Sequence, residues 1–167
     1  AAYLCVWLGL VGGLLMSSAW FDGIIGRAKL LAIHQTASIA GVVLGLAHGL
    51  VLIPDGWTDF GVADILVPFA SYYEPTLSGL GTVSFYLFAL VTFSFWLRNQ
   101  IGAQTWKKIH YAAFVAYVAA LWHGVKIGTD TGELWVLGIY ILTSMTVIAA
   151  LVVRMTLVPA LLTLLGE

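Results

Sequence analysis

Four histidines, all inside long apolar stretches, are the residues of this sequence best suited to chemistry. His34 and His48 stand in one stretch, HQTASIAGVVLGLAHG, and His110 and His123 stand in another, HYAAFVAYVAALWHG. Ionisable side chains inside a membrane are costly and usually serve a function. One histidine alone could equally form an interhelical hydrogen bond, but two similarly spaced pairs indicate that the imidazoles act together as ligands.

The ligand type and its surroundings favour haem. Two imidazoles at the same depth can supply both axial ligands of one haem iron. Imidazole binds iron, copper and zinc alike, so the ligand type alone does not select the metal. No aspartate, glutamate or cysteine is expected at the depth of either pair, which argues against a zinc or non-haem iron site. A flat apolar porphyrin also suits an apolar bundle better than a bare cation does.

Five apolar runs of membrane-spanning length must position these histidines. They cover residues 3–20, 31–53, 79–97, 108–127 and 134–158. The chain is 61% apolar and only 9% charged, whereas about a quarter of the residues of a soluble domain are charged. We therefore predict an all-α, polytopic membrane bundle in which residues 1–167 form one domain. No basic residue precedes the first run, so we interpret it as a spanning helix and not as a signal peptide.

Basic residues gather at one end of the predicted helices. The connections 21–30 and 98–108 and the end of the last helix hold six of the seven, which are Arg27, Lys29, Arg98, Lys107, Lys108 and Arg154. The connections 54–78 and 126–133 hold Lys126 and most of the acidic residues. The positive-inside rule assigns the basic end to the cytoplasm. The first residue then lies outside, and we expect a sixth, earlier helix to be missing from the N-terminus.

The longest connection, 54–78, has an apolar middle, VADILVPFASYY, which Pro68 interrupts and which is too short to span. We expect a short helix or re-entrant piece along the outer interface, with Trp57, Tyr72 and Tyr73 at the level of the lipid headgroups.

Two other classes of site are excluded by composition. The single cysteine, Cys5, rules out an internal disulfide and any cysteine-based zinc or iron–sulfur site. The sequence has no basic patch and no recognition element, so no nucleic-acid partner is expected.

The second and fourth predicted helices run parallel, because one helix separates them. Depth then pairs His34 with His110 near the cytoplasmic ends and His48 with His123 near the outer ends. Fourteen residues fall roughly 40° short of four turns, so His34 and His48 share a face, whereas thirteen residues leave His110 and His123 roughly 140° apart. A local winding irregularity or a tilt of the fourth helix is therefore required.

Three glycines follow one another at four-residue steps along the second helix: Gly41, Gly45 and Gly49. They either allow close helix–helix packing or leave room for porphyrin faces.

The paired spacing resembles the ferric reductase-like transmembrane domain that ferric reductases, NADPH oxidases and the haem subunit of bacterial methionine sulfoxide reductase share. The resemblance covers residues 24–158, and it includes VPFASYYEP before the third helix and LRNQIGAQTWKKIHYAAFVAY leading into the fourth. It implies two b-type haems, an inner one on His34 and His110 and an outer one on His48 and His123.

The resemblance implies transmembrane electron transfer through these haems. The sequence has no Gly-rich dinucleotide fingerprint and no soluble length for a flavin domain, so we expect an oxidoreductase subunit without its own flavin or NAD(P)H site. Its electrons would come from a separate donor protein, a flavoprotein or a quinone, and other membrane subunits are expected beside it. The expected location is a bacterial cell membrane, where the chain would be a multi-pass protein in the lipid bilayer.

Two alternatives remain open. The chain could be a membrane anchor subunit of a larger redox or energy-converting complex, with haems that are structural or absent. It could also be a quinone-reactive cytochrome b that shares the ligand spacing.

The haem propionates need partners, because a carboxylate is costly in hydrocarbon unless it is paired or hydrated. Inner propionates can reach the basic residues Arg27, Lys29, Arg98, Lys107 and Lys108. Trp106 can donate its indole N–H there. On the outer side only Lys126 is available, three positions after His123. Lys126 could instead be a snorkelling side chain that marks the helix end.

Overall fold

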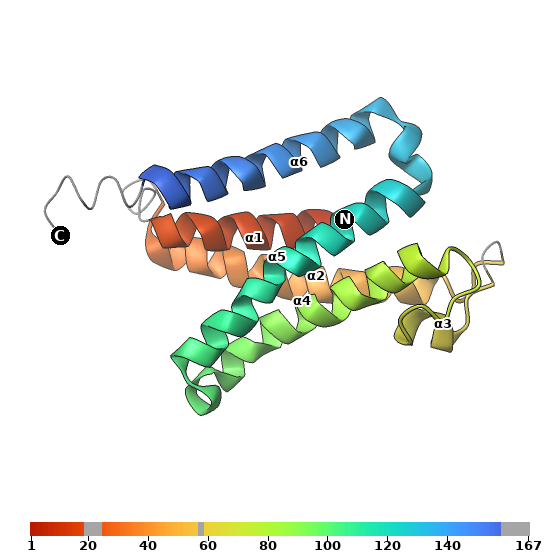
Figure 1. The fold of residues 1–167 in the computed structure, drawn as a ribbon, viewed down its shortest axis with the longest axis horizontal. Helices are drawn as coiled ribbons and strands as arrows, with labels where there is room; N and C mark the ends of the chain where they lie inside the picture. The colour runs from red at the N-terminus through yellow and green to blue at the C-terminus, as the bar shows by residue number, and fades with distance from the viewer. Residues whose placement is uncertain (19–24, 57–58, 158–167) are drawn as a thin grey trace, which may run out of the picture.

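The computed structural model describes residues 1–18, 25–56 and 59–157, and within these ranges it is helical, with no strand. Five long helices lie side by side (Figure 1): α1 (Ala2–Ser18), α2 (Arg27–Val51), α4 (Pro75–Ile101), α5 (Ala103–Ile127) and α6 (Leu134–Val152). Three short elements join or extend them: α3 (Val62–Leu66), a 3₁₀ turn (Thr129–Gly132) and a π-helical turn (Val153–Leu157). The predicted all-α class is confirmed.

Three helices are long and apolar enough to cross a membrane, Arg27–Val51, Pro75–Ile101 and Leu134–Thr156. Large apolar side chains such as Val43, Leu90 and Leu142 remain exposed on them. Apolar surface of this extent suits lipid and not water, so the chain has the character of a membrane protein. The other two predicted spans correspond to α1, which is shorter, and α5, whose first turns carry two lysines.

The connection predicted at 98–108 is far shorter in the structure. α4 continues to Ile101 and α5 begins at Ala103, so Gly102 alone joins them, with a φ of 80°. Helical hydrogen bonding does not depend on apolar side chains, so both helices extend beyond the apolar runs. Glycine adopts this positive φ without the strain that a side chain would cause.

The connection between α2 and α4 contains the predicted short helix, α3. Its N-terminus is held by Asp64, whose carboxylate accepts the N–H of Gly61 at 2.8 Å. Thr82 of α4 donates to the carbonyl of Ile65 at 3.1 Å, which ties α3 to the bundle. Tyr72 and Tyr73 are both exposed, as residues at a lipid headgroup level would be. Trp57 lies outside the described residues.

The core lies where α1 meets the other long helices. It contains buried apolar side chains from all five: Val6, Leu10, Val42, Phe88, Ala116, Tyr117 and Val147. Hydroxyl groups join three of these helices, α1, α5 and α6, because the Tyr3 hydroxyl lies 2.6 Å from that of Thr143 and 3.1 Å from that of Tyr117. Polar groups in a membrane interior need such internal partners.

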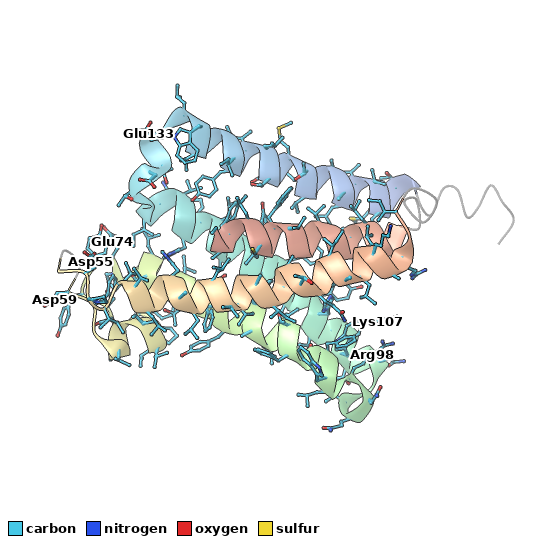
Figure 2. The ribbon with its side chains drawn as sticks, turned by 180° about the vertical axis from the view of Figure 1, so that it is seen from behind. Asp55, Asp59, Glu74, Arg98, Lys107 and Glu133 are labelled. Atoms are coloured by element: carbon cyan, nitrogen blue, oxygen red, sulfur yellow. The ribbon has the colours of Figure 1, made fainter. Side chains whose placement is uncertain are left out.

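The two ends of the bundle differ in charge. Figure 2 shows Arg98 and Lys107 at one end and the carboxylates Asp55, Asp59, Glu74 and Glu133 at the other. The segregation of charge predicted along the sequence is therefore also a segregation in space.

Candidate metal centres

The fold brings the four histidines together as two pairs, each formed between α2 and α5. The ring centroids of His34 and His110 lie 6.0 Å apart, and those of His48 and His123 lie 6.4 Å apart. These are the partners that helix direction and depth predict from the sequence.

Both separations match two imidazoles on opposite sides of one metal ion. A first-row metal lies about 2.0–2.1 Å from an imidazole nitrogen, and the ring centre lies about 1.1 Å farther on, so two axial rings have centroids about 6.3 Å apart. The interplanar angles are 64° and 77°. Either angle is compatible with axial ligation, because each ring can rotate about the common nitrogen–metal–nitrogen axis.

His110 and His123, thirteen residues apart on α5, can both face α2 because α5 is tilted relative to α2. α5 is an uninterrupted α-helix from Ala103 to Ile127. Figure 1 shows α5 inclined to α2. The face that α5 turns towards α2 therefore changes along its length, and both of its histidines can meet their partners.

His34 is seated against α1. Its Nδ1 lies 2.7 Å from the carbonyl oxygen of Gly9, so Nδ1–H donates to this carbonyl and Nε2 is left for a metal. A Cβ added at Gly13, one turn later, would lie 3.4 Å from Cε1 of His34. The small residues of α1 therefore allow the ring to lie against the helix backbone.

His123 is seated against α4 in the same manner. Its Nδ1 lies 2.8 Å from the carbonyl oxygen of Leu77. A Cβ added at Gly81, again one turn later, would lie 2.7 Å from Cε1 and 2.8 Å from Nδ1 of the ring. No side chain fits there unless the ring moves, so Gly81 and the Leu77 carbonyl together fix this imidazole.

His110 is held by stacking. The Trp106 ring lies one turn before it, with centroids 4.8 Å apart and planes 29° apart. The Arg98 guanidinium lies 5.0 Å from the centre of the same indole. The basic residue and the indole predicted at this end are thus packed together beside one of the histidines.

Three buried polar atoms near His110 lack a hydrogen-bond partner among the described residues: Nε1 of Trp106, Nδ1 of His110 and Oγ1 of Thr92. The bond from Ser84 to the Ala116 carbonyl sets the antiparallel register of α4 and α5, and this register brings Thr92 to the level of Trp106 and His110. Buried polar atoms are nearly always paired. An acceptor such as a propionate would satisfy the indole N–H, so the residues of this end fit a haem.

The remaining predicted contacts lie at the two ends of the bundle. Arg27 is the first residue of α2, and Lys107 lies beside Trp106 in α5. At the opposite end, Lys126 places its ammonium 5.3 Å from the centre of the exposed Trp122 ring. His48 is exposed and makes no hydrogen bond with any residue that the structure describes.

Two glycines of α2, Gly41 and Gly45, pack closely against α4. A Cβ at Gly41 would lie 2.8 Å from Cε1 of Phe88, and one at Gly45 would lie 3.2 Å from Phe85. Both phenylalanines belong to α4. The glycines that position the histidines are Gly13 and Gly81, which the sequence analysis missed, although a glycine inside an apolar helix is itself a signal of close approach.

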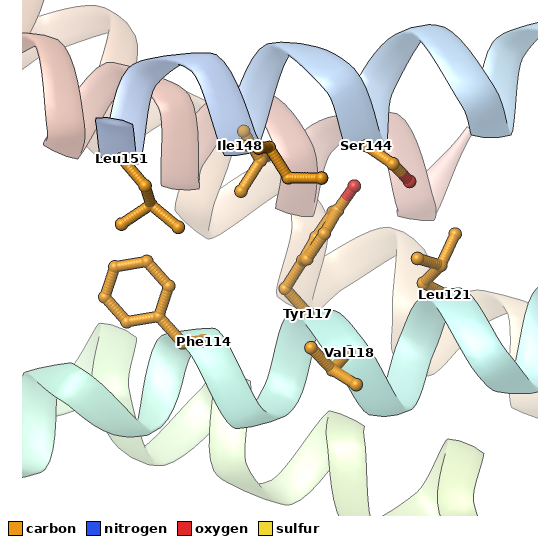
Figure 3. A pocket seen from close by; sticks show the side chains of 8 residues that line it. Phe114, Tyr117, Val118, Leu121, Ser144, Ile148 and Leu151 are labelled. Atoms are coloured by element: carbon orange, nitrogen blue, oxygen red, sulfur yellow. The ribbon is translucent and has the colours of Figure 1, made fainter. Parts of the chain in front are cut away.

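An apolar groove of about 490 Å³ lies between α5 and α6 (Figure 3). Phe114 and Tyr117, which lie between the ligands along α5, face this groove. Its other lining residues are Val118, Leu121, Ser144, Val147, Ile148 and Leu151. None of them is a histidine or belongs to α2, so the groove is distinct from the histidine pairs.

Among the residues that the structure describes, each pair consists of two imidazoles and no further side chain of a metal-binding type. Within residues 1–18, 25–56 and 59–157, no three side chains of histidine, cysteine, aspartate or glutamate gather as a metal site. Two axial imidazoles are the complete protein ligand set of a six-coordinate haem, because the porphyrin supplies the other four nitrogens.

Comparison with protein-family models, curated proteins and solved structures finds no match to this chain.

Proposed function

We propose that this chain carries electrons across a membrane through two b-type haems, each held by one histidine pair. The observation that supports this most directly is the separation of the paired rings, 6.0 Å and 6.4 Å, at two levels of the same two helices. The haems would supply the redox chemistry. The chain holds them, sets their distance and places charges near them.

The two levels are well separated along the membrane normal. Fourteen residues of α2 between His34 and His48 correspond to a rise of about 21 Å, which is a large part of the roughly 30 Å of a hydrocarbon core. One pair therefore serves each half of the bilayer. In this arrangement all five long helices span the membrane, with the basic end in the cytoplasm.

The proposal places the chain with ferric reductase-like cytochrome b subunits. Trp106 stacks on His110, Arg98 lies over Trp106, and Lys107 lies at the same end of the bundle (Figure 2). These cationic and donor groups suit both propionates and an anionic or electron-rich partner. An electron donor that is a separate flavoprotein or a quinone would deliver to this end.

The proposal is tested by the haem content of the purified full chain. We expect two haems per chain and, after reduction with dithionite, the spectrum of low-spin, six-coordinate b-type haem. A haem-free chain in an intact membrane complex would contradict the proposal and favour an anchor subunit.

Opposite ends of the bundle should be accessible from opposite sides of the membrane. We expect cysteines introduced at Gln104 and Tyr72, in a Cys5→Ala background, to react with an impermeant thiol reagent from the cytoplasmic and the outer side respectively. Gln104 follows the Gly102 turn, and Tyr72 is fully exposed in the connection after α3. Labelling of both positions from one side would refute the five-span arrangement.

Lys126→Ala should lower the midpoint potential of the outer haem. A nearby positive charge favours the added electron, so its removal disfavours reduction. Lys107→Ala, at the other end of α5, is the matched control and should affect only the inner haem. A redox titration that resolves both haems measures the two shifts. An unchanged outer potential in Lys126→Ala would mean that this lysine only snorkels.

A further inference from the structure

We propose that His48 is the exchangeable ligand among the four histidines. The outer haem would then bind a small neutral ligand such as carbon monoxide in place of His48, while the inner haem would keep both of its histidine ligands. This inference rests on the proposed function, because it concerns how the chain holds the two haems. It assigns to the outer haem a ligand-binding site that electron transfer alone does not require.

The outer pair is held on one side only. His123 donates Nδ1–H to the Leu77 carbonyl at 2.8 Å and lies against Gly81. Such a bond fixes the tautomer and the ring orientation of a ligand and raises its basicity. His48 has no corresponding bond within the described ranges, and it is the one exposed histidine of the four.

The position of His48 in its helix also favours movement. It lies in the last turn of α2, three residues before the helix ends at Val51. Backbone hydrogen bonds at helix ends fray more readily than those in the interior. His123 instead lies on a helix that packs closely against α4, from which its carbonyl partner comes.

The inner pair is held on both sides. His34 donates to the Gly9 carbonyl at 2.7 Å. His110 stacks on the Trp106 indole, and the Arg98 guanidinium lies over the same indole. Neither inner imidazole can swing away without breaking a hydrogen bond or a stack, so both inner coordination positions stay filled.

The expected difference in ligand strength between His48 and His123 follows from the hydrogen bond that, of the two, only His123 makes within the described residues. Loss of a partner that orients a metal-bound histidine typically costs about 10- to 100-fold in metal affinity. His48 should therefore be a weaker axial ligand than His123, its partner in the outer pair, by about this factor. With haem bound, exchange would break the bond between the iron and a ring nitrogen of His48 and form one bond from the iron to the carbon of carbon monoxide, with no electron or proton transferred.

The test uses the purified full chain in detergent, reduced with dithionite and titrated with carbon monoxide. We expect one of the two haems to bind it. His48→Ala should keep both haems, with the outer one five-coordinate and binding carbon monoxide about 10- to 100-fold more tightly than the unsubstituted chain does. His123→Ala should lose the outer haem and keep the inner one, whose low-spin spectrum shows that the variant has folded.

Gly81→Ala provides a second variant that retains all four histidines. Its added Cβ should displace the His123 ring and weaken retention of the outer haem, while Gly138→Ala, where a Cβ meets nothing within 4 Å, should not. If carbon monoxide binds both haems or neither, or if His123→Ala keeps the outer haem that His48→Ala loses, the inference is wrong. A chain that purifies without any haem instead overturns the proposed function itself.

Discussion

His34→Ala is expected to halve the haem content of the chain and to stop electrons from crossing the membrane. In the proposed arrangement His34 is an inner haem ligand, and a hydrogen bond from its Nδ1 to the Gly9 carbonyl, at 2.7 Å, orients the ring. Without it, the inner haem would keep His110 alone, whose own Nδ1 has no partner among the described residues. Since His48 lies about 21 Å farther along α2 than His34, a haem held by the outer pair could not take over the cytoplasmic half of the path.

Two measurements check this expectation. The pyridine haemochrome of the purified variant gives the haem content per chain. Vesicles that contain the protein, with a reductant on one side and ferricyanide on the other, report transmembrane electron transfer. Gln35→Ala, one residue along α2 and outside both pairs, is the matched control and should leave both values unchanged. A His34→Ala chain that retains two low-spin haems would show that the ring separation at the inner pair does not reflect ligation.

Gly41→Leu is expected to destabilise the whole bundle. A Cβ at this position would lie 2.8 Å from Cε1 of Phe88 and 3.4 Å from Cβ of Cys5, so the larger side chain would have to force α2 away from α4 and α1. Overpacking of this kind costs about 1–3 kcal/mol. For a chain of this size, that corresponds to a fall of roughly 2–12 °C in the apparent midpoint of thermal unfolding.

The midpoint can be followed by circular dichroism of the detergent-solubilised protein. Gly138→Leu is the control, because Gly138 is a helical glycine of α6 at which a Cβ would meet nothing within 4 Å. It should lower the midpoint by less than Gly41→Leu or raise it slightly, since leucine favours a helix over glycine. Equal losses in both variants would mean that contact with Phe88 is not the cause of the loss in Gly41→Leu.

Periodicity and helix direction were enough to predict which histidines meet. The pairs follow from two facts that a sequence contains: the number of residues between ligands, and the single helix that separates two parallel ones. The stacking of Trp106 on His110 could also be predicted from the sequence, because the two residues lie four apart on one helix.

The features that orient the ligands could not be predicted in this way. The partners of His34 and His123 are backbone carbonyls, of Gly9 and Leu77, and every residue type has a carbonyl. Which carbonyl is reached depends on helix rotation and on the close approach that Gly13 and Gly81 permit. The length of the α4–α5 connection could not be predicted either. An apolar run marks the part of a helix that suits lipid, but it does not show at which residues the helical hydrogen bonds begin and end.

The way in which the helices associate has a consequence for biogenesis. The most extensive helix contacts join α1 to α2 and α4 to α5, and each anchored histidine finds its carbonyl inside its own hairpin: His34 on α1 and His123 on α4. The α1–α2 hairpin can therefore enter the membrane with His34 already oriented before α4 and α5 are made, and the α4–α5 hairpin can orient His123 without help from the first. We expect the cofactor to join two ready halves late in assembly, and two fragments separated within the connection between α2 and α4 to recombine when they are synthesised together.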